Sequence, residues 1–501
     1  MRYVKQSYTL LWVVASVILG IAVAEVLWLR MPAFVWLAMT ITALLPACLT
    51  GRYRMVQSFL LLVCFFCVGG WLCTLRIERG MVAMPAERVT YDAIVTATPN
   101  DSICELSVVC IYGYEAPLPL KVRAKMGCGS KLKVGDGLVA ESRLYGIHRP
   151  RGEEDFFPRY LLCHGFAAST RIYGGKWKRC RLSTARLGLA QRFTLSCRIM
   201  RDRLLSLASR TNLTDDTRAL LYAMTVGERS GLTASLRGDF SRSGVSHVLA
   251  LSGLHFGMVY AVILFFLYPW RRRFTVRILF LVAIWLYAFF VGLSPSVLRS
   301  SLMLTAYSLL AIDYREHASV SILSFVALVL LLVNPMGLFD VGFQLSFASV
   351  LSILLFYPQF VRLLPERYIP THPLLGRMAS VGFLSLAAQL GTAPLVAYHF
   401  GTFSVYFLLA NYVVIPLVTV IVPLGILFFL TLGLACFNGW VAWLLGCLLS
   451  WLVGFVHFVQ SLPFASVTGL RPPVWMVVAI YMLLMVAYLL ALRIKKRQHP
   501  K

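Results

Sequence analysis

Long apolar runs on either side of one polar block restrict what this chain can fold into. About 20 consecutive apolar residues form a helix that crosses the ~30 Å hydrocarbon core of a bilayer. Twelve such runs occur, near residues 8–28, 31–49, 57–75, 245–267, 276–291, 295–312, 319–333, 341–356, 379–399, 404–434, 440–460 and 474–492. The chain of 501 residues is 59% hydrophobic and only 14% charged, which excludes an ordinary soluble protein of this length. The pattern predicts a polytopic α-helical membrane protein.

The polar block, from about residue 76 to 216, has the period-two alternation of β-strands. Five strand-like stretches lie between turn signals, over residues 88–99, 104–114, 118–126, 131–147 and 165–175. Short strands in this number favour a small barrel. We therefore expect a small β (OB-like) extracytoplasmic domain inserted in the helical membrane protein.

Residues 187–210 differ from the rest of the block, because Leu, Phe, Ile and Met alternate there with Arg192, Arg198, Arg201 and Arg203. This pattern is typical of an amphipathic helix at a membrane surface. Four segments follow from these observations. They are a three-helix transmembrane segment over 1–75, the OB-like domain over 76–186, amphipathic interfacial helices over 187–244 and a second transmembrane domain over 245–501.

Basic residues in the short loops predict the orientation, since Lys and Arg are retained in the cytoplasm. Arg2 and Lys5 predict a cytoplasmic N-terminus, and Arg271 to Arg273 together with the basic tail predict further cytoplasmic segments. Three crossings then deliver the polar block outside the plasma (inner) membrane. For both the N-terminus and the basic tail to be cytoplasmic, the run 404–434 must make one net crossing. Pro416 and Pro423 in this run favour a broken or re-entrant path.

The net charge of +26 is largely the expected consequence of this topology. The outer block is an exception, because roughly 23 basic and about 12 acidic residues lie between 76 and 210. An external basic excess indicates an anionic partner. Seven aromatic residues there are available for stacking on bases: Tyr91, Tyr112, Tyr114, Tyr145, Phe156, Phe157 and Tyr160.

Cysteine usage gives two separate indications. Cys64 and Cys67 form the only CxxC, and their apolar surroundings favour packing over metal or redox chemistry. Six further cysteines lie in or just after the outer block, where an oxidising compartment would allow disulfides of unspecified pairing: Cys104, Cys110, Cys128, Cys163, Cys180 and Cys197.

Polar residues inside apolar runs are costly and by default mark pathways or helix contacts. This chain places Arg299, Asp340, Gln344, Gln389 and Asn411 in such positions. Arg299 could instead extend to the interface, Asp340 could cap the following helix, and the glutamines could bond neighbouring helices. Taken together, the five residues predict a polar seam through the helix bundle.

His247 and His255 raise the question of a metal site at the start of an apolar run. Their separation of eight residues is about 12 Å along a continuous helix, which is too far for one zinc ion. Ser252 and His255 could form a nucleophile and base, but no orienting acid is evident nearby. We therefore expect no metal, no cofactor and no catalytic residue. The alternative is a helix that begins again at Ser252, with its hydroxyl capping free N–H groups and its positive end able to attract phosphate.

Several long motifs resemble those of the ComEC family of competence DNA channels. The resemblance covers about residues 220 to 423. It is carried by Gly227-Glu-Arg-Ser-Gly-Leu232, by Phe240-Ser-Arg-Ser-Gly-Val-Ser-His247-Val-Leu-Ala-Leu-Ser252-Gly253-Leu-His255-Phe-Gly257, by Gly292-Leu-Ser-Pro-Ser-Val-Leu-Arg299, by Asn334-Pro335 with Asp340-Val-Gly-Phe-Gln344-Leu-Ser346, by Gln389-Leu-Gly-Thr392-Ala-Pro394, and by Asn411 with Pro416.

The resemblance implies a channel that passes single-stranded DNA into the cytoplasm during natural transformation. The outer domain would receive the strand, and the competence (channel) domain over 245–501 would conduct it past His247, Ser252, Gly253, His255, Arg299, Asp340, Gln344, Gln389 and Asn411. Membrane lipid would surround it. The chain has neither the His/Asp zinc motif of the metallo-β-lactamase-like domain found in many members nor a P-loop. We therefore expect no enzymatic activity of its own, and a separate DNA receptor, motor ATPase and nuclease. The alternatives are a transporter of another anionic substrate, such as a lipid-linked or nucleotide metabolite, and an intramembrane enzyme.

Overall fold

The computed structural model describes residues 9–27, 31–100, 102–115, 118–127, 132–147, 156–211, 213–267, 274–310, 318–364 and 373–498. Arg2, Lys5, Arg271 to Arg273, Cys128 and the last three residues of the basic tail therefore lie outside the described residues. The chain divides into two compact units. The first comprises Met1–Arg203, Tyr287–Gly292 and Leu302–Asp340, and the second comprises Leu204–Leu286, Leu293–Ser301 and Val341–Lys501.

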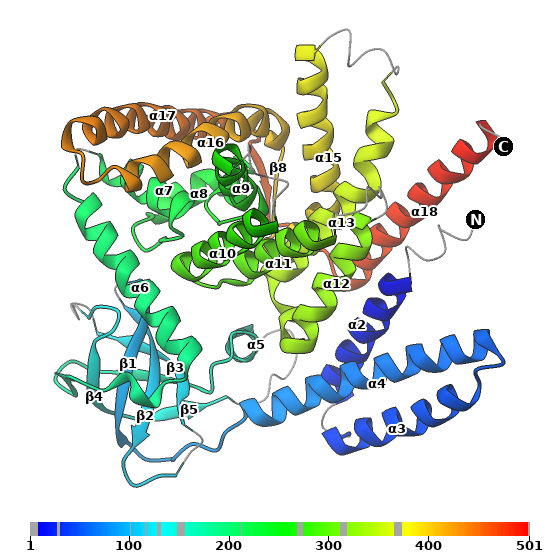
Figure 1. Ribbon diagram of the computed structural model, residues 1–501, viewed down its shortest axis with the longest axis horizontal. Helices are drawn as coiled ribbons and strands as arrows, with labels where there is room; N and C mark the ends of the chain where they lie inside the picture. Colours follow the sequence, from blue (N-terminus) through cyan, green and yellow to red (C-terminus); the bar gives the residue numbers. More distant parts are fainter. Residues whose placement is uncertain are drawn as a thin grey trace. The chain divides into compact units, whose positions relative to one another are not determined.

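Three N-terminal helices begin the first unit: α2 (Thr9–Leu27), α3 (Ala33–Leu49) and α4 (Arg54–Gly80). Both α2 and α3 pack against α4 (Figure 1). At Gly69 of α4 a side chain is excluded, since an added Cβ would lie 2.5 Å from the carbonyl oxygen of Val17. Small residues allow helix backbones to approach closely in this way within membranes.

The polar block folds into one seven-stranded mixed sheet with strand order β5-β6-β3-β2-β1-β4-β7. The strands are β1 (Val89–Asn100), β2 (Ile103–Ile111), β3 (Leu120–Met126), β4 (Gly137–Ser142), β5 (Leu144–Gly146), β6 (Ala168–Ile172) and β7 (Trp177–Cys180). Each of the five predicted stretches contains a strand, whereas β7 was missed. The β3–β6 pair is parallel, and the other pairs are antiparallel.

The sheet closes because the chain continues from β4 directly into β5. Strand β4 pairs with β1, and β5 pairs with β6, which brings the two ends of the β1-β2-β3-β6 series together. Inside, the hydroxyl of Ser142 lies 2.8 Å from that of Tyr91 and 2.7 Å from that of Thr170. These buried contacts satisfy three polar groups within the apolar core. The arrangement agrees with the small OB-like barrel predicted from the sequence.

Helix α6 (Leu189–Ala208) follows the sheet and a single 3-10 turn, η1 (Thr184–Arg186). Its Leu195 packs with Ile94 and Val109 of the sheet. Arg198 donates to the carbonyl of Thr96 at 2.8 Å, and Arg201 donates to that of Val291 at 3.3 Å. Arg192 also donates to backbone carbonyls, those of Leu187 and Ala185. At least three of the four arginines of this helix therefore bond carbonyls of the protein, and its place at a membrane surface stays a prediction.

The remaining elements are mostly helical, and α10 and α11 are each divided between the two units. They are α7 (Asp215–Thr225), α8 (Ala234–Arg242), η2 (Ser246–Val248), α9 (Gly253–Leu267), α10 (Phe274–Val291), α11 (Pro295–Leu310), α12 (Ala318–Val333), η4 (Pro335–Phe339), α13 (Val341–Val361), α15 (Pro373–Phe400), β8 (Thr402–Ser404), α16 (Phe407–Leu430), α17 (Ala435–Ser461), β9 (Ser466–Thr468) and α18 (Val474–Gln498). Residues of α7, α8, α9, α16 and α17 form one apolar core in the second unit, with Phe240 and Val414 fully buried.

Seven helices among the described residues are long and apolar enough to cross a membrane: α2, α4, α13, α15, α16, α17 and α18. Four shorter apolar helices include α3 and α12. The chain is thus a multi-pass membrane protein, as predicted. The expected break in the run 404–434 is absent, because α16 continues through both Pro416 and Pro423.

The two-stranded sheet of β8 and β9 joins two distant segments of the second unit. Thr402 pairs with Thr468, and Ser404 pairs with Ser466. The segment after α15 and the segment after α17 therefore lie side by side (Figure 1). Since α16 and α17 connect these two neighbouring strands, the chain returns after α17 to the place where α16 begins.

All cysteines of the described residues are free thiols, so the predicted disulfides do not form among them. Burial raises the pKa of Cys104 to about 11 and that of Cys163 to about 12. Both thiols are buried in the first unit. They contribute to packing in the protonated form.

Candidate functional site

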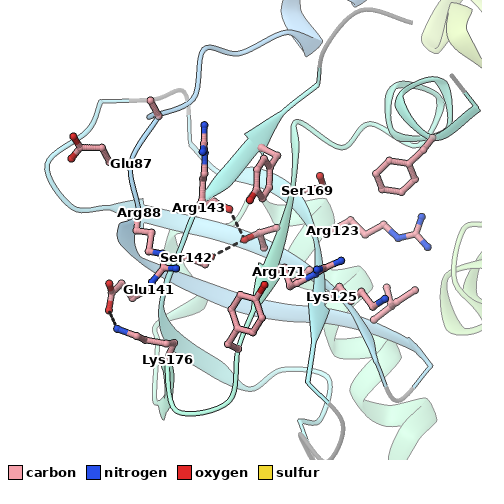
Figure 2. A pocket seen from close by; sticks show the side chains of 17 residues that line it. Glu87, Arg88, Arg123, Lys125, Glu141, Ser142, Arg143, Ser169, Arg171 and Lys176 are labelled. Carbon is pink, nitrogen blue, oxygen red and sulfur yellow. Dashed lines mark hydrogen bonds and ion pairs between the residues drawn. The ribbon is translucent and has the colours of Figure 1, made fainter.

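A basic groove of about 980 Å³ lies on the outside of the β domain. Six basic and two acidic residues line it, together with three aromatic residues. The lining comprises Ala86, Glu87, Arg88, Ile103, Arg123, Ala124, Lys125, Glu141, Ser142, Arg143, Tyr145, Phe157, Ser169, Thr170, Arg171, Tyr173 and Lys176. Figure 2 shows the labelled charged side chains gathered around the groove.

Strand alternation explains why these side chains share one face. In β3 the residues Leu120, Val122, Ala124 and Met126 are buried, so Arg123 and Lys125 face outward. The same alternation in β6 turns Ser169 and Arg171 outward. The alternation in the sequence therefore indicates which cations each strand exposes. It does not indicate which distant strands are paired.

The strand register places three cations in a row. Lys125 of β3 is paired with Arg171 of β6. Arg143 immediately precedes Leu144, which is paired with the neighbouring Thr170. Like charges on adjacent strands destabilise a sheet by up to ~1 kcal/mol a pair. A row of this kind is consistent with a site whose ligand supplies the compensating negative charge.

The charges in the groove are mostly uncompensated by the protein. Lys176 pairs with Glu141 at 3.0 Å. Arg88, Lys125 and Arg171 are exposed and have no hydrogen bond or ion pair with any residue that the structure describes. Exposed cations without internal partners are available to phosphate groups, whose counterions are released on binding.

Exposed aromatic rings flank the cations. Tyr145, Phe157 and Tyr173 are each about half exposed, and Phe157 comes from helix α5 (Phe156–Cys163). The guanidinium of Arg123 lies 5.5 Å from the Phe157 ring centre and 4.8 Å from that of Tyr160. Aromatic faces beside cations are the usual elements of single-strand binding sites.

Three of the aromatic residues predicted to stack are used otherwise. Tyr91 is fully buried in the barrel, and this burial raises its pKa. Tyr112 donates a hydrogen bond to Asp92 at 3.0 Å, which raises the pKa of that phenol. Tyr114 donates to the carbonyl of Ala83. The side chain of Phe156 lies outside the described residues.

Arg299 of α11 lies inside the second unit, with only 3% of its surface exposed. Its guanidinium carbon is 5.9 Å from the ring centre of Phe347 on α13, a distance that permits a cation–π contact. The alternative in which Arg299 reaches the membrane interface is therefore wrong. Its burial supports the interpretation of Arg299 as part of a polar seam.

Gln344 of α13 contacts His399 of α15, with Oε1 and Nε2 separated by 2.8 Å. Sequence analysis missed His399, because it stands at the end of an apolar run where a polar residue is expected. The contact agrees with the alternative in which Gln344 bonds two helices. Gln389, also on α15, makes no hydrogen bond with the described residues.

Asn411 of α16 is 8% exposed, and its Oδ1 has no hydrogen-bond partner among the described residues. An unsatisfied buried amide costs free energy unless water or a ligand reaches it. Asp340 belongs to the first unit, whereas the other candidate path residues belong to the second. Its Oδ2 lies 3.7 Å from Nε2 of His164.

The stretch around Ser252 is not one continuous helix. The 3-10 turn η2 ends at Val248, and α9 begins at Gly253, which confirms the predicted restart. The predicted capping is reversed, however. The backbone N–H of Ser252 donates to Nδ1 of His255 at 3.3 Å. The histidine ring therefore accepts the hydrogen bond of the residue that precedes the helix.

Gly244 permits the turn that precedes this stretch. Its φ of +82° is a conformation that favours glycine, and an added Cβ would lie 2.8 Å from the side chain of Ser404. The chain therefore turns tightly beside β8 before η2. His247 is exposed at this point, whereas His255 is fully buried.

The Ser252 hydroxyl lies 3.0 Å from Nδ1 of His255, as a nucleophile and base would. The Nε2 of His255 has no hydrogen-bond partner among the described residues, so no described carboxylate orients the ring. Groups of three or more His, Cys, Asp or Glu side chains that could hold a metal do not occur in the part of the chain that the structure describes.

Apolar helices of spanning length, an inserted β barrel and a basic groove define a multi-pass membrane protein with a candidate polyanion site. The chain belongs to the competence protein family, whose model, described as "Competence protein", matches residues 224–494. The match covers all of the candidate path residues and none of the groove.

Several curated proteins are similar to this chain. "ComE operon protein 3" of Bacillus subtilis (strain 168) is 34% identical over 208 residues, which are 41% of this chain and 25% of that protein. "Recombination protein 2" of Haemophilus influenzae is 26% identical over 220 residues, 41% of this chain and 27% of the relative. An uncharacterised protein of Aquifex aeolicus is 34% identical over 217 residues, which are 43% of this chain and 48% of that protein. The aligned regions thus span a quarter to about half of these relatives. No solved structure matches the chain.

Proposed function

We propose that this protein is an inner-membrane channel that translocates single-stranded DNA into the cytoplasm during natural transformation. The observation that carries the proposal is the row of Arg143, Arg171 and Lys125 across neighbouring strands of the outer groove. Membership of the competence protein family supports natural transformation as the process in which the protein acts. In this proposal the groove receives the strand, and the helical part of the chain conducts it.

The composition of the groove favours a single strand over a duplex as its ligand. Cations along a groove neutralise the phosphates, while exposed rings stack on bases that a duplex would keep paired. Tyr145 and Tyr173 provide such rings beside the cations. A small metabolite would need fewer charges and a more enclosed site.

Buried polar side chains support a hydrophilic route through the helices. A strand loses phosphate hydration when it enters a membrane, so fixed polar groups have to replace the lost water. In the proposed route Arg299 provides positive charge, and Gln344 and Asn411 provide amides; all three lie in the second unit. Ser252 directly precedes α9, and Gly253 and His255 lie in its first turn. Helix α9 contributes Met258 to the apolar core of the second unit.

The proposal includes a cytoplasmic N-terminus, an outer β domain and no enzymatic step. A separate DNA receptor, motor ATPase and nuclease would supply capture, energy and strand degradation. The Ser252–His255 contact keeps an intramembrane enzyme as a second candidate. A transporter of another anionic substrate would explain the buried polar groups, but it has less need of the flanking aromatic rings.

The first experiment measures chromosomal transformation in a competent host that lacks this gene and carries either the wild-type gene or a variant. The double variant Lys125→Ala/Arg171→Ala should lower transformation strongly, while DNA still accumulates at the cell surface. Lys178→Ala is a matched control, since Lys178 is an exposed cation on β7 outside the groove. Normal transformation in the deletion strain would contradict the proposal.

A second experiment measures binding of a fluorescent oligonucleotide to the full-length protein in lipid nanodiscs. The logarithm of the affinity should fall steeply with the logarithm of salt concentration, with a slope of about −0.7 for each phosphate contacted. The double variant should have a shallower slope than either the wild type or Lys178→Ala. Binding that does not depend on salt would favour the metabolite transporter.

A further inference from the structure

Helix α5 forms one wall of the basic groove. Phe157 on its first turn lines the groove directly. The next turn holds Tyr160, whose ring lies 4.8 Å from the guanidinium of Arg123, another residue of the lining. The shape of the groove therefore depends on where α5 is held.

The opposite end of α5 is bonded to η4, the turn between α12 and α13. Asn334 donates from Nδ2 to the carbonyl of Cys163 at 2.8 Å. The Cys163 thiol lies 3.0 Å from the carbonyl oxygen of Met336, to which it donates. His164, directly after the helix, lies 3.7 Å from Asp340. All these residues belong to the first unit.

Two further contacts join α5 to the ends of N-terminal helices. Arg159 forms an ion pair with Glu25 of α2 at 2.7 Å. Leu162 is buried beside Gly80 of α4, where an added Cβ would lie 2.7 Å from its Cδ2. An eight-residue helix is too short to be stable by itself. Its position is consequently set by these partners.

We infer that Asn334 and Asp340 are positioning residues, which hold α5 through the Cys163 carbonyl and His164 so that Phe157 and Arg123 line the groove. The inference rests on the proposed function. It assigns the Asn334–Asp340 segment to strand capture outside the membrane rather than to the conducting path. It also connects the groove physically to the turn between α12 and α13.

The test compares oligonucleotide affinity in nanodiscs for the full-length wild type, Asn334→Ala, Asp340→Asn and Arg123→Ala. Each of the three substitutions should weaken binding about five-fold or more, the smallest loss expected for removal of one stacked base. Asp239→Asn is the matched control, because Asp239 lies 3.6 Å from His457 in a similar carboxylate–imidazole contact and does not line the groove. It should bind like the wild type.

A double-substitution cycle separates positioning from general destabilisation. If Asn334 acts through α5, Asn334→Ala/Arg123→Ala should bind no worse than Arg123→Ala alone, because residues that act through one contact are not additive. Hydrogen exchange of the α5 amides should also rise in Asn334→Ala, while that of β1 and β2 stays unchanged. Asp340→Glu, which retains the carboxylate, should restore most of the affinity lost in Asp340→Asn.

Additive losses, or wild-type affinity in both Asn334→Ala and Asp340→Asn, would overturn the inference. If Arg123→Ala binds weakly while those two variants bind normally, the groove remains a DNA site and only the positioning role fails. If the wild type itself binds no oligonucleotide, the proposed function and the inference both fail.

Discussion

Lys125 of β3 and Arg171 of β6 are direct neighbours on parallel strands, and both side chains are exposed. Neither has a partner among the described residues. Two like charges in this arrangement oppose folding, since such pairs destabilise a sheet by ~0.2–1 kcal/mol. The like-charge pair therefore lowers the stability of the β domain slightly, at the place where we propose that a polyanion binds.

Replacing Lys125 by Ala should separate stability from binding. Because the like-charge pair is removed, the free energy of unfolding should stay constant or rise by up to ~1 kcal/mol, while oligonucleotide affinity falls. Thermal unfolding of the full-length protein and fluorescence anisotropy measure the two quantities. A variant that lost stability and kept its affinity would show that Lys125 has a structural role instead.

Replacing Arg299 should impair transport. Arg299→Ala removes a buried cation beside Phe347, so we expect a large fall in transformation at a normal protein level in the membrane. Arg299→Lys keeps the charge without the planar guanidinium and should retain part of the activity. The frequency of chromosomal transformants, normalised to immunoblot signal, is the measurement. Wild-type transformation by Arg299→Ala would remove this residue from the path.

Replacing Ser252 tests the enzyme alternative. Ser252→Ala preserves the backbone N–H that donates to His255 and removes only the hydroxyl. We therefore expect transformation within about two-fold of the wild type, since removing one such hydrogen bond costs roughly 0.5–1.5 kcal/mol of stability. Gly253→Leu should be more harmful, because it places a large side chain near Ser300. Complete loss of function in well-expressed Ser252→Ala would favour an enzyme with a serine nucleophile.

The raised pKa of the Cys104 thiol predicts a specific pH dependence. The folded-state pKa of about 11 exceeds the ordinary value of 9.0, so the folded state disfavours the thiolate. Stability from this group is complete below pH 9 and is lost as the pH rises toward 11. Cys104→Ala should therefore lose less stability than the wild type between pH 9 and 11, measured by chemical denaturation. Equal losses in the two proteins would contradict the buried, protonated thiol.

Local patterns in the sequence were sufficient to predict which parts of the chain form helices and which form strands. Apolar runs of spanning length predict helices, because backbone groups in a bilayer must be bonded within the segment. Period-two alternation predicted the β domain, and small polar residues at 243–253 predicted where α9 begins. Strand β7 escaped detection because WKRC is short and mostly exposed, so it lacks the buried alternate positions that mark a strand.

The partners of individual side chains depended on tertiary structure. Arg198 and Arg201 have the spacing of a surface helix, yet they bond carbonyls of distant segments. Asp340 and Gln344 are separated by one helical turn in the sequence, but their partners are His164 and His399 respectively. Such contacts join residues far apart along the chain. A local periodicity in the sequence does not predict such contacts.

Local sequence patterns alone predict many apolar helices, one inserted β domain and an excess of positive charge in that domain. Only the tertiary structure decided that Arg143, Arg171 and Lys125 stand in one row. The physical reason is the strand register, which pairs β3 with β6 across more than 40 intervening residues. Hydrophobic alternation selects which face each strand exposes, but the packing of the whole barrel selects which strands become neighbours.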